Sequence, residues 1–568
     1  MKNTLLLIVS LFLSISCGPR NKLFAGEPLS CDAVPSRIVS TGAETIAAGP
    51  FQPTWASLRG YGEAPEWFRD AKFGIWAHWG PQCQPEDGDW YARKMYIEGD
   101  RAYKFHLAHY GHPSEFGFKD VINEWKAEHW EPQKLVAFYK RVGARYFFAL
   151  ANHHDNFDLW ASCHQEWNST RAGPRKDIIA GWAAAARAQG LPFGVSVHAS
   201  HAWSWYEVAQ GADRDGPRKG VPYDGKLTAA DGKGKWWDGL DPQKLYAQNH
   251  APSPDFQNPS RMNSRWEWGD GCSQPDLAYC QNYYDRVIDL INQAHPDLLY
   301  FDDTALPLWP VSDAGLKIAA HFYNSHIARN GAADPGVLFG KILNDEQRQC
   351  LTWDIERGVP ATTLPYAWQT DTCLGNWHYD RSIYERNRYK TARAVIHMLA
   401  DVVSKNGNLL LSVPVRGDGT IDGKETAILE EIRAWMDVNH EAIYATRPWK
   451  IFGEGPASEG VALTAQGFNE GKTKPFTPSD VRYTRSKDGH TLYIIVLGVP
   501  AEPLTLKTLG RAASGARITK LELLGAPGTS VPSEPTRWRQ TDDALTIAPA
   551  PASQLPPSDI AIVYKAAL

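Results

Sequence analysis

The sequence lacks the short motifs of several common enzyme classes. It has no Cys-x-x-Cys pair, so neither a zinc site nor a thioredoxin-like redox motif is indicated. It has no Gly-x-Ser-x-Gly, which removes the nucleophile elbow of the Ser-His-Asp hydrolases. No Gly-x-Gly-x-x-Gly follows a strand-like run, which argues against a dinucleotide-binding sheet.

An excess of one charge is also missing. The formal net charge is -5, which gives no reason to expect nucleic acid or an anionic membrane as a partner. No segment beyond the N-terminal region is long and apolar enough to span a bilayer. With 43% hydrophobic and 22% charged residues, the composition is that of a soluble globular protein. At 568 residues, the chain predicts two large units, or a barrel and a smaller module.

The N-terminus resembles an export signal. Lys2 supplies a positive charge, and residues 5–16 form a short apolar stretch ending in small residues. Cys17 follows Ser-Ile-Ser, which resembles a bacterial lipobox and makes Cys17 a candidate lipid anchor; ordinary cleavage near Ala25 is the alternative. We therefore expect residues 1–25 to be a signal peptide. The mature protein would be periplasmic, attached to the outer surface of a bacterium, or secreted.

Tryptophan and cysteine are the informative minor residues. The chain has 23 tryptophans, and exposed indole faces suit the apolar faces of sugar rings, although many of these side chains will be core. Export would permit disulfides among the eight cysteines. Cys272 and Cys280 are close enough in sequence to pair within one loop.

Strand-like and helix-like segments alternate from about residue 65 to 440. Strands are expected at 72–78, 145–152, 192–198, 298–302, 336–343 and 408–413, and helices at 132–142, 177–189, 282–294, 315–330 and 386–404. This alternation predicts an α/β fold with a (β/α)8-like barrel over residues 50–447, with an open doubly wound sheet as the rival.

After residue 448 the pattern changes to short alternating runs separated by proline and glycine. These runs cover 461–466, 481–485, 491–497, 520–524, 544–547 and 560–564. They predict an antiparallel β-sandwich over residues 448–568. The loop from about 205 to 278 is long and rich in Gly, Asp, Pro and Trp, which is typical of functional or mobile loops.

Polar side chains gather at the carboxyl ends of the expected strands, where barrel enzymes place their chemistry. They are His78, the pair His153 and His154, and the pair Asp302 and Asp303. Metal binding is one interpretation, but adjacent residues on a strand point to opposite faces, which disfavours a shared ion. The other interpretation is a carboxylate pair with histidines and aromatics around it, as in glycoside hydrolysis.

Several stretches resemble the α-L-fucosidases of glycoside hydrolase family 29, in the order found in that family. They are WFRDAKFGIWAHWG at 67–80, DWY at 89–91, NHHDNFDLW at 152–160, PDLLYFDD at 296–303, NGNLLLSVPVRGDGTI at 406–421 and NHEAIYATRPW at 439–449. The resemblance implies a (β/α)8-like barrel with a C-terminal β-sandwich, a retaining exo-acting fucosidase, fucosylated oligosaccharides or glycoconjugates as substrates, and no cofactor or metal.

The resemblance also implies roles for individual residues. Asp302 would be the nucleophile, and Glu356 in WDIERG would be the acid/base, with Glu346 as the alternative. A retaining pair would lie about 5–5.5 Å apart. Fucose would be bound by His78, Asp89, Trp90, His153, His154, His198, Tyr300 and Trp377.

The chain departs from the family pattern at several places. Asp89 stands where the family usually has a glutamate. Asn152 replaces a lysine, Asn156 and Asp303 replace glycines, and Tyr300 replaces a tryptophan. None of these changes removes a catalytic carboxylate. They leave open a sulfated or otherwise modified fucoside, or a related L-sugar. The alternative from another class is a catalytically silent fucose-binding or carbohydrate-binding surface protein on the same scaffold.

Overall fold

Eight parallel strands close into a barrel in the computed structural model, which describes residues 29–258, 268, 269, 271–461, 463, 469–525 and 537–568. The strands are β1 (Phe73–Ala77), β2 (Phe147–Asn152), β3 (Phe193–Val197), β4 (Leu298–Phe301), β5 (Val337–Gly340), β6 (Thr352–Asp354), β7 (Trp368–Cys373) and β8 (Gly407–Ser412). They follow one another in chain order, and β8 closes the barrel on β1, with Phe73 opposite Leu409. The predicted barrel is thus confirmed, and the open sheet is excluded.

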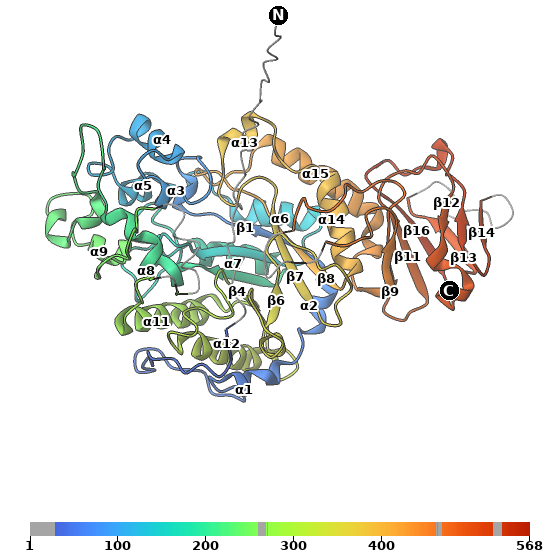
Figure 1. Ribbon diagram of the computed structural model, residues 1–568, viewed down its shortest axis with the longest axis horizontal. Coiled ribbons are helices and arrows are strands. Elements are labelled where there is room, and N and C mark those ends of the chain that lie inside the picture. Colours follow the sequence, from blue (N-terminus) through green and yellow to red (C-terminus); the bar gives the residue numbers. More distant parts are fainter. Residues whose placement is uncertain (1–28, 259–267, 270, 462, 464–468, 526–536) are drawn as a thin grey trace, which may run out of the picture.

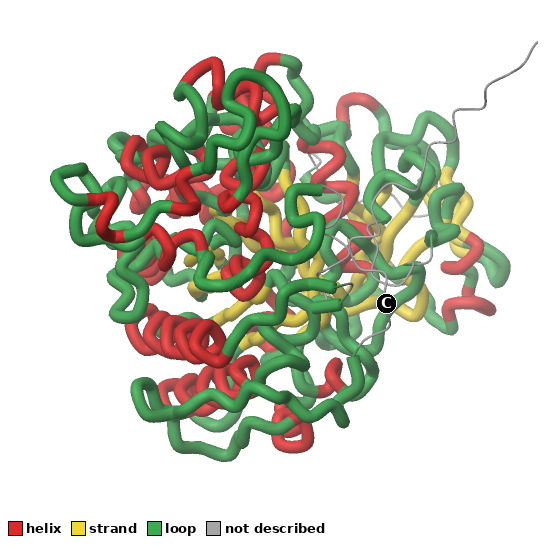
Figure 2. The backbone as a smooth tube through the Cα atoms, turned by 60° about the vertical axis from the view of Figure 1, so that its left-hand side comes forward, coloured by secondary structure: helices red, strands yellow, loops and turns green. Residues whose placement is uncertain are grey.

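Helices surround the strands, and the C-terminal sheets lie to one side of the barrel (Figures 1 and 2). The longer helices are α6 (Pro132–Val142), α7 (Ile178–Ala188), α11 (Leu277–Ala294), α12 (Ala314–Asn330), α14 (Ala392–Ser404) and α15 (Gly423–Asn439). The shorter ones include α1 (Trp55–Leu58), α2 (Glu66–Ala71), α3 (Tyr91–Lys94), α4 (Arg101–His109), α5 (Phe118–Glu124), α8 (Ala202–Trp205), α9 (Pro242–Tyr246) and α13 (Arg381–Glu385). No helix among the described residues is long and apolar enough to cross a membrane.

Aromatic rings fill the barrel interior. The ring of Phe148 lies 5.9 Å from that of Phe339 and 6.5 Å from that of Tyr300, measured between centroids. Gly194 makes room for this packing, because a Cβ there would meet the ring of Phe148 at 2.6 Å. The interior is therefore a packed core, and functional side chains are confined to the open end of the barrel.

The C-terminal region forms two antiparallel sheets, as predicted. One has the order β13 (Lys520–Leu523), β16 (Ile562–Ala567), β11 (Thr491–Val496), β10 (Val481–Ser486) and β9 (Thr446–Glu454). The other has the order β12 (Leu504–Leu506), β15 (Leu545–Ile547) and β14 (Trp538–Gln540). Alternate residues of β11 enter different cores: Leu492 and Ile494 join the C-terminal core, whereas Tyr493 and Ile495 join that of the barrel. The larger sheet is therefore buried on both faces, and α14 packs against β9 and β10.

The predictions missed several strands for identifiable reasons. β6 has only three residues, and β7 carries Gln369 and Asp371, so neither is a continuous apolar run. Strands β9, β12 and β14 were also missed. Most of the run predicted at 461–466 lies outside the described residues, as does the predicted signal peptide.

Two further predictions differ from the structure. The helix expected at 386–404 begins only at Ala392, because Thr391 caps it by accepting a hydrogen bond from the backbone N–H of Ala394. Cys280 is a buried free thiol, so it forms no disulfide with Cys272. The loop from 205 to 278 contains short helical turns and α9 in its described part.

A buried ion pair attaches the loop after β2 to α11. The Nε of Arg286 donates to Oδ2 of Asp158 at 3.0 Å, and its Nη1 donates to Oδ1 of Asn156 at 2.6 Å. Both charged side chains are almost inaccessible to solvent. Asn152 donates to the same aspartate at 2.9 Å. The pair therefore fixes the segment that carries His153 and His154.

We expect Asp158→Ala to destabilise the protein by about 3–5 kcal/mol, because it leaves the Arg286 charge buried without its partner. Thermal and urea denaturation measure the loss. The control is Asp437→Ala, whose partner Arg433 lies on an exposed helix face, and it should cost about 1 kcal/mol or less. Equal losses in the two variants would contradict this role for the buried pair.

Candidate active site

Asp302 follows the end of β4 directly and is held on both carboxylate oxygens. Its Oδ1 accepts a hydrogen bond from Nζ of Lys341 at 2.5 Å. Its Oδ2 lies 3.1 Å from Nδ1 of His198 and 3.1 Å from Nε2 of His154. The side chain retains 17% solvent exposure. Asp302 is thus fixed at the barrel mouth while a small part of it stays accessible.

Asp303 turns away from this cluster. Its carboxylate accepts from the hydroxyl of Ser200 and lies 3.3 Å from Nε2 of His201. Although β4 ends at Phe301, before both aspartates, the two consecutive side chains thus have different partners.

Only one of the two histidines can donate to Asp302 while both are neutral. Nδ1 of His154 lies 2.6 Å from the backbone carbonyl oxygen of His198, which can only accept, so this nitrogen carries the proton. Neutral His154 therefore presents a lone pair at Nε2. His198 has no such constraint on Nδ1 and donates from it to Asp302. Burial lowers the pKa of both imidazoles, that of His198 to about 4, which favours their neutral forms.

Glu356 lies in the loop after β6 and meets Asp302 through a shared lysine. Its Oε2 accepts from Nζ of Lys341 at 2.6 Å. Since Lys341 bonds to both carboxylates through one nitrogen, the two bonded oxygens are no more than about 5 Å apart. Like Asp302, Glu356 has a side chain that is 17% exposed. This upper limit is shorter than the spacing of about 6.5–9.5 Å in inverting glycosidases, so it favours a retaining pair.

The surroundings shift the pKa values of the two carboxyl groups in opposite directions. Burial alone would raise the pKa of Asp302, but the Lys341 ammonium and the hydrogen bond from His198 outweigh it and hold that pKa well below its ordinary value. Burial raises the pKa of Glu356, and the negative charge of Asp302 adds to the rise, although Lys341 opposes it. Asp302 is thus the anion of the pair, and Glu356 is the better proton donor.

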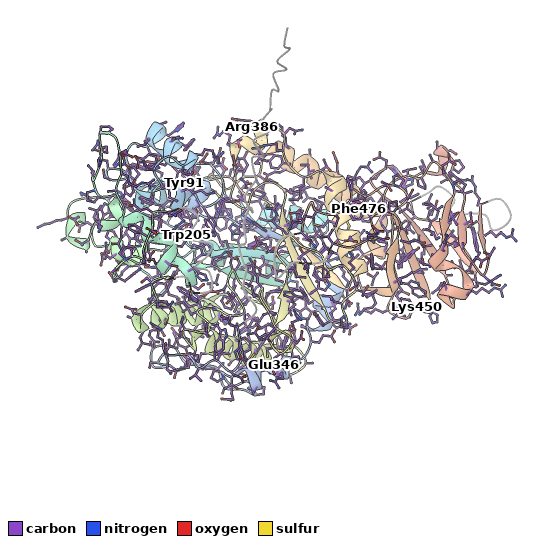
Figure 3. All side chains as sticks on the ribbon, viewed as in Figure 1. Tyr91, Trp205, Glu346, Arg386, Lys450 and Phe476 are labelled. Carbon is purple, nitrogen blue, oxygen red and sulfur yellow. The ribbon has the colours of Figure 1, made fainter. Side chains whose placement is uncertain are left out.

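The alternative acid, Glu346, lies elsewhere. It is 55% exposed and pairs with Arg59 at 3.4 Å. Figure 3 shows it at the lower edge of the molecule, well away from Trp205.

Most of the residues expected to bind sugar form a cluster that reaches Asp302 through His154 and His198. The ring of His78 lies 5.3 Å from that of His153 and 5.2 Å from that of His198, measured between centroids. Trp90 is 6.1 Å from His154, and Trp377 is 5.8 Å from His78. The structure therefore brings these side chains into one cluster, as a small polyhydroxylated ligand would require.

Asp89 and Tyr300 stand at the borders of this cluster. Oδ1 of Asp89 accepts from the backbone N–H of His378 at 2.6 Å, which places it beside the histidines. Tyr300 is buried, and its hydroxyl donates to Asp371 at 2.9 Å. Its polar end therefore points to a carboxylate of the barrel interior.

Four further residues belong to the site and were missed. Lys341 follows β5 directly, and the predicted strand at 336–343 extended past it and hid this strand-end position. His378 is next to Trp377 in sequence, and its ring is 4.5 Å from that of His78. Trp205 lies 5.6 Å from His154 and 5.8 Å from Trp90. Asp371, on the unrecognised β7, carries a pKa that burial raises well above its ordinary value.

Two groups of side chains could hold a metal ion. The ligand atoms of His78, His153 and His198 lie within 4.8 Å of one another. Those of His154, His198 and Asp302 do so as well. The objection from strand alternation does not apply, because β2 ends at Asn152, before the two adjacent histidines. An ion in either group would occupy hydrogen-bonding positions that a sugar would use.

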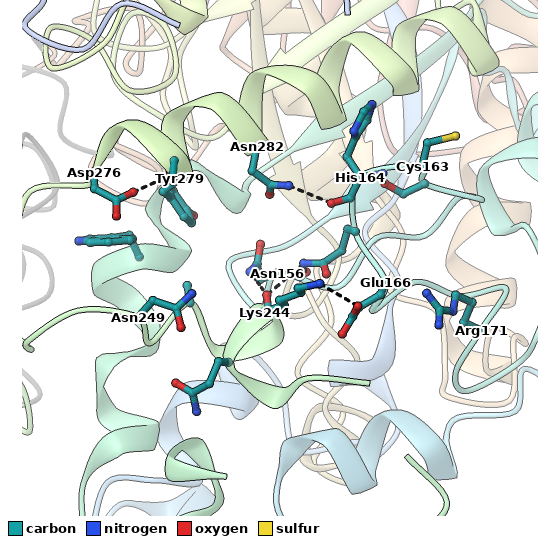
Figure 4. A pocket seen from close by; sticks show the side chains of 16 residues that line it. Asn156, Cys163, His164, Glu166, Arg171, Lys244, Asn249, Asp276, Tyr279 and Asn282 are labelled. Carbon is teal, nitrogen blue, oxygen red and sulfur yellow. Dashed lines mark hydrogen bonds and ion pairs between the residues drawn. The ribbon is translucent and has the colours of Figure 1, made fainter. Parts of the chain in front are cut away.

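A separate cavity of about 410 Å³ lies beside the loop after β2 (Figure 4). Its walls come from the loop after β2, from α9 and from the start of α11, and they include Glu166, Lys244 and Tyr279. None of the residues expected to bind sugar lines it.

Two carboxyl groups this close at the mouth of a parallel barrel are the arrangement that glycoside hydrolases use. Comparison with known proteins narrows the class. The model of the alpha-L-fucosidase family matches residues 38–441. The chain belongs to this family.

Similar proteins agree with that assignment. The rat tissue alpha-L-fucosidase (Rattus norvegicus) is 23% identical over 73% of this chain and 77% of its own length. The human plasma alpha-L-fucosidase (Homo sapiens) is 25% identical over 84% and 85%. The Thermotoga maritima alpha-fucosidase in complex with fucose has a TM-score of 0.63 at 21% identity, covering 91% of this chain and all of that one. The structural likeness confirms the barrel with its C-terminal sheets.

The loop that carries Glu356 is held by a segment from beyond the barrel. The backbone N–H of Glu470 donates to the carbonyl of Arg357 at 2.9 Å, and Nε of Arg357 donates to Oε2 of Glu470 at 2.6 Å. Asn469 exchanges two hydrogen bonds with the backbone of Val359, at 2.9 and 2.8 Å. The C-terminal region therefore helps to position the candidate acid.

We expect Glu470→Ala to lower hydrolysis of an α-L-fucoside by about 10- to 100-fold, because Glu356 would lose its fixed position. Steady-state kinetics with aryl fucosides measure this, and poor leaving groups should suffer most. Glu459→Ala is the matched control, since Glu459 is 84% exposed and pairs only with Lys474 among the described residues. An equal loss of activity in both variants would contradict this positioning role for Glu470.

Proposed function

We propose that this protein is an exo-acting α-L-fucosidase that removes terminal α-linked L-fucose from glycans and retains the anomeric configuration. The observation that carries the proposal is the Asp302–Glu356 pair, held within about 5 Å by one lysine. The names of similar proteins support fucose as the sugar. One structural relative, from Bacteroides thetaiotaomicron, is described as a trapped covalent intermediate of an alpha-L-fucosidase; it has a TM-score of 0.55 at 17% identity.

In the first step Asp302 attacks the anomeric carbon of fucose. Glu356 donates its proton to the glycosidic oxygen as the bond between that oxygen and the anomeric carbon breaks. A covalent fucosyl ester of Asp302 results, and the defucosylated glycan leaves. The low pKa of Asp302 and the raised pKa of Glu356 put each group in the form that this step needs.

In the second step Glu356, now deprotonated, accepts a proton from water as the water attacks the same carbon. Fucose is released, and both carboxyl groups return to their starting forms. Neutral His78, His153 and His198 would hydrogen-bond the sugar hydroxyls, and Trp90 or Trp377 would cover the C6 methyl group. Because the histidines are buried, sugar hydroxyls would replace water as their partners.

The test is hydrolysis of an aryl α-L-fucoside, with 2-fluoro-fucosyl fluoride as a covalent probe. We expect the wild-type protein to turn over the fucoside and to acquire a fucosyl label on Asp302, found by peptide mass spectrometry. Asp302→Asn should lose hydrolysis by at least about 10⁴-fold and take no label. Anomeric proton NMR should show retention in the first product.

The controls separate the candidate acids and the alternative functions. Glu356→Gln should lower activity on poor leaving groups by about 10²–10⁴-fold, whereas Glu346→Gln should leave it unchanged. Loss of activity on chelation would indicate a metal hydrolase instead. Fucose binding without turnover in the wild-type protein would indicate a silent sugar-binding protein. Turnover of a sulfated fucoside alone would point to a modified sugar.

The rate should depend on pH in a bell shape. Activity needs Asp302 as the anion and Glu356 protonated. Because the pKa of Asp302 is lowered, the acidic limb should lie below the range of an ordinary carboxyl group. Because the pKa of Glu356 is raised, the alkaline limb should lie above it. A profile of kcat/KM that falls between pH 3 and 5 on its alkaline side would refute this assignment.

A further inference from the structure

Lys341 is the only lysine among the described residues that forms ion pairs with both candidate catalytic carboxylates. Its side chain is 6% exposed, and its Nζ lies 5.4 Å from the centroid of the Tyr300 ring. Its backbone is fixed on both sides: its N–H donates to the carbonyl of Thr304 at 3.1 Å, and its carbonyl accepts from Nε1 of Trp353 at 2.7 Å. The ammonium group is therefore delivered to a set position between Asp302 and Glu356.

More carboxyl groups surround this ammonium than it can neutralise. The titratable groups around it are Asp302, Asp354, Glu356, Asp371, Tyr300, His154, His198 and Arg357. Burial raises the pKa of Asp354 to about 7 and that of Asp371 well above its ordinary value. Asp371 thus keeps its proton at ordinary pH and Asp354 is protonated below about pH 7, where the single positive charge of Lys341 matches one negative charge on the reacting pair.

We propose that Lys341 is a positioning residue that stabilises whichever of Asp302 and Glu356 is the anion, and so serves both halves of the reaction. In the free enzyme it pairs with the Asp302 carboxylate while Glu356 holds a proton. This inference rests on the proposed function, since it assigns a role within the same two-step reaction.

The charges balance at each stage. When Asp302 forms its bond to the anomeric carbon, it becomes a neutral ester, and Glu356 loses its proton to the departing oxygen. The negative charge thus passes from Asp302 to Glu356. Lys341 is placed to pair with either one, because in the free enzyme its Nζ is hydrogen-bonded to both. When water attacks, its proton goes to Glu356, and the electron pair of the ester bond returns to Asp302. One cation faces one anion throughout, so no unpaired charge is buried.

Removal of the Lys341 charge should change the protonation of both carboxyl groups, which the loss of a purely structural lysine would not do. Without the Lys341 charge, both carboxyl groups would hold protons to higher pH, because an adjacent cation favours the anionic form of each. A larger fraction of Glu356 would then be protonated in the fucosyl-enzyme, although the second step needs its carboxylate as the base. The fucosyl ester of Asp302 would accumulate.

The experiment compares Lys341→Met with Lys341→Arg, which keeps the charge, using aryl α-L-fucosides from pH 3 to 10. We expect Lys341→Met to lower kcat at neutral pH by at least about 100-fold. Both limbs of its pH–rate profile should move to higher pH by about one unit or more. With an activated leaving group, mass spectrometry should show the ester on Asp302. Lys341→Arg should keep both limbs near their wild-type positions.

Lys405→Met is the matched control for burial. Lys405 is 5% exposed and pairs with Asp401 at 3.0 Å, and that aspartate also binds Arg482. We expect this variant to lose stability without a shift of either limb. If Lys341→Met does not fold, Lys341→Gln, which keeps a hydrogen-bond donor without the charge, serves in its place.

The outcomes separate this inference from the proposed function. A folded Lys341→Met or Lys341→Gln variant that keeps both limbs of the pH–rate profile at their wild-type positions and accumulates no ester would overturn the role of Lys341. That result would leave the proposed fucosidase function standing. A wild-type protein that neither hydrolyses the fucoside nor takes the label would overturn the proposed function itself.

Discussion

The ammonium group of Lys341 lies between Asp302 and Glu356, and much of the barrel mouth is arranged around these three ionisable groups. Asp302 comes from the end of β4, Lys341 from the end of β5, and Glu356 from the loop after β6. Three successive strands of a closed parallel barrel present their carboxyl ends side by side, so short connections suffice to bring these groups together. Two carboxyl groups and an ammonium are costly to bury unless each has a partner, and here Lys341 pairs with both carboxyl groups.

The rest of the structure supports that arrangement from several directions. Aromatic rings fill the barrel below it and exclude water, which strengthens the electrostatic interactions above. The Arg286–Asp158 pair fixes the loop that carries His153 and His154 to α11. Asn469 and Glu470 hold the loop that carries Glu356. The C-terminal region thus contributes to the site through contacts, although the residues assigned to catalysis all come from the barrel.

The histidine cluster makes the candidate site polar without adding charge. Burial lowers the pKa of His78, His153, His154 and His198, so these rings are neutral donors and acceptors at ordinary pH. Neutral rings suit sugar hydroxyls better than charged ones, because desolvating them costs less. The same geometry explains why a metal ion is a conceivable competitor: neutral imidazoles that bind hydroxyls also offer lone pairs to a cation.

The sequence by itself determined the barrel and the C-terminal sheets, because apolar runs mark buried parallel strands. It also marked His78, His153, His154 and Asp302, because polar residues follow the ends of those strands. It also indicated Glu356 by resemblance but left Glu346 open, and only the structure places Glu346 at the surface beside Arg59. Lys341, His378, Trp205 and Asp371 needed the tertiary structure. Strand boundaries shift by a residue or two without altering the apolar pattern, and β7 is interrupted by polar side chains that face the interior. Which side chain meets which across the barrel depends on closure, which no local pattern encodes.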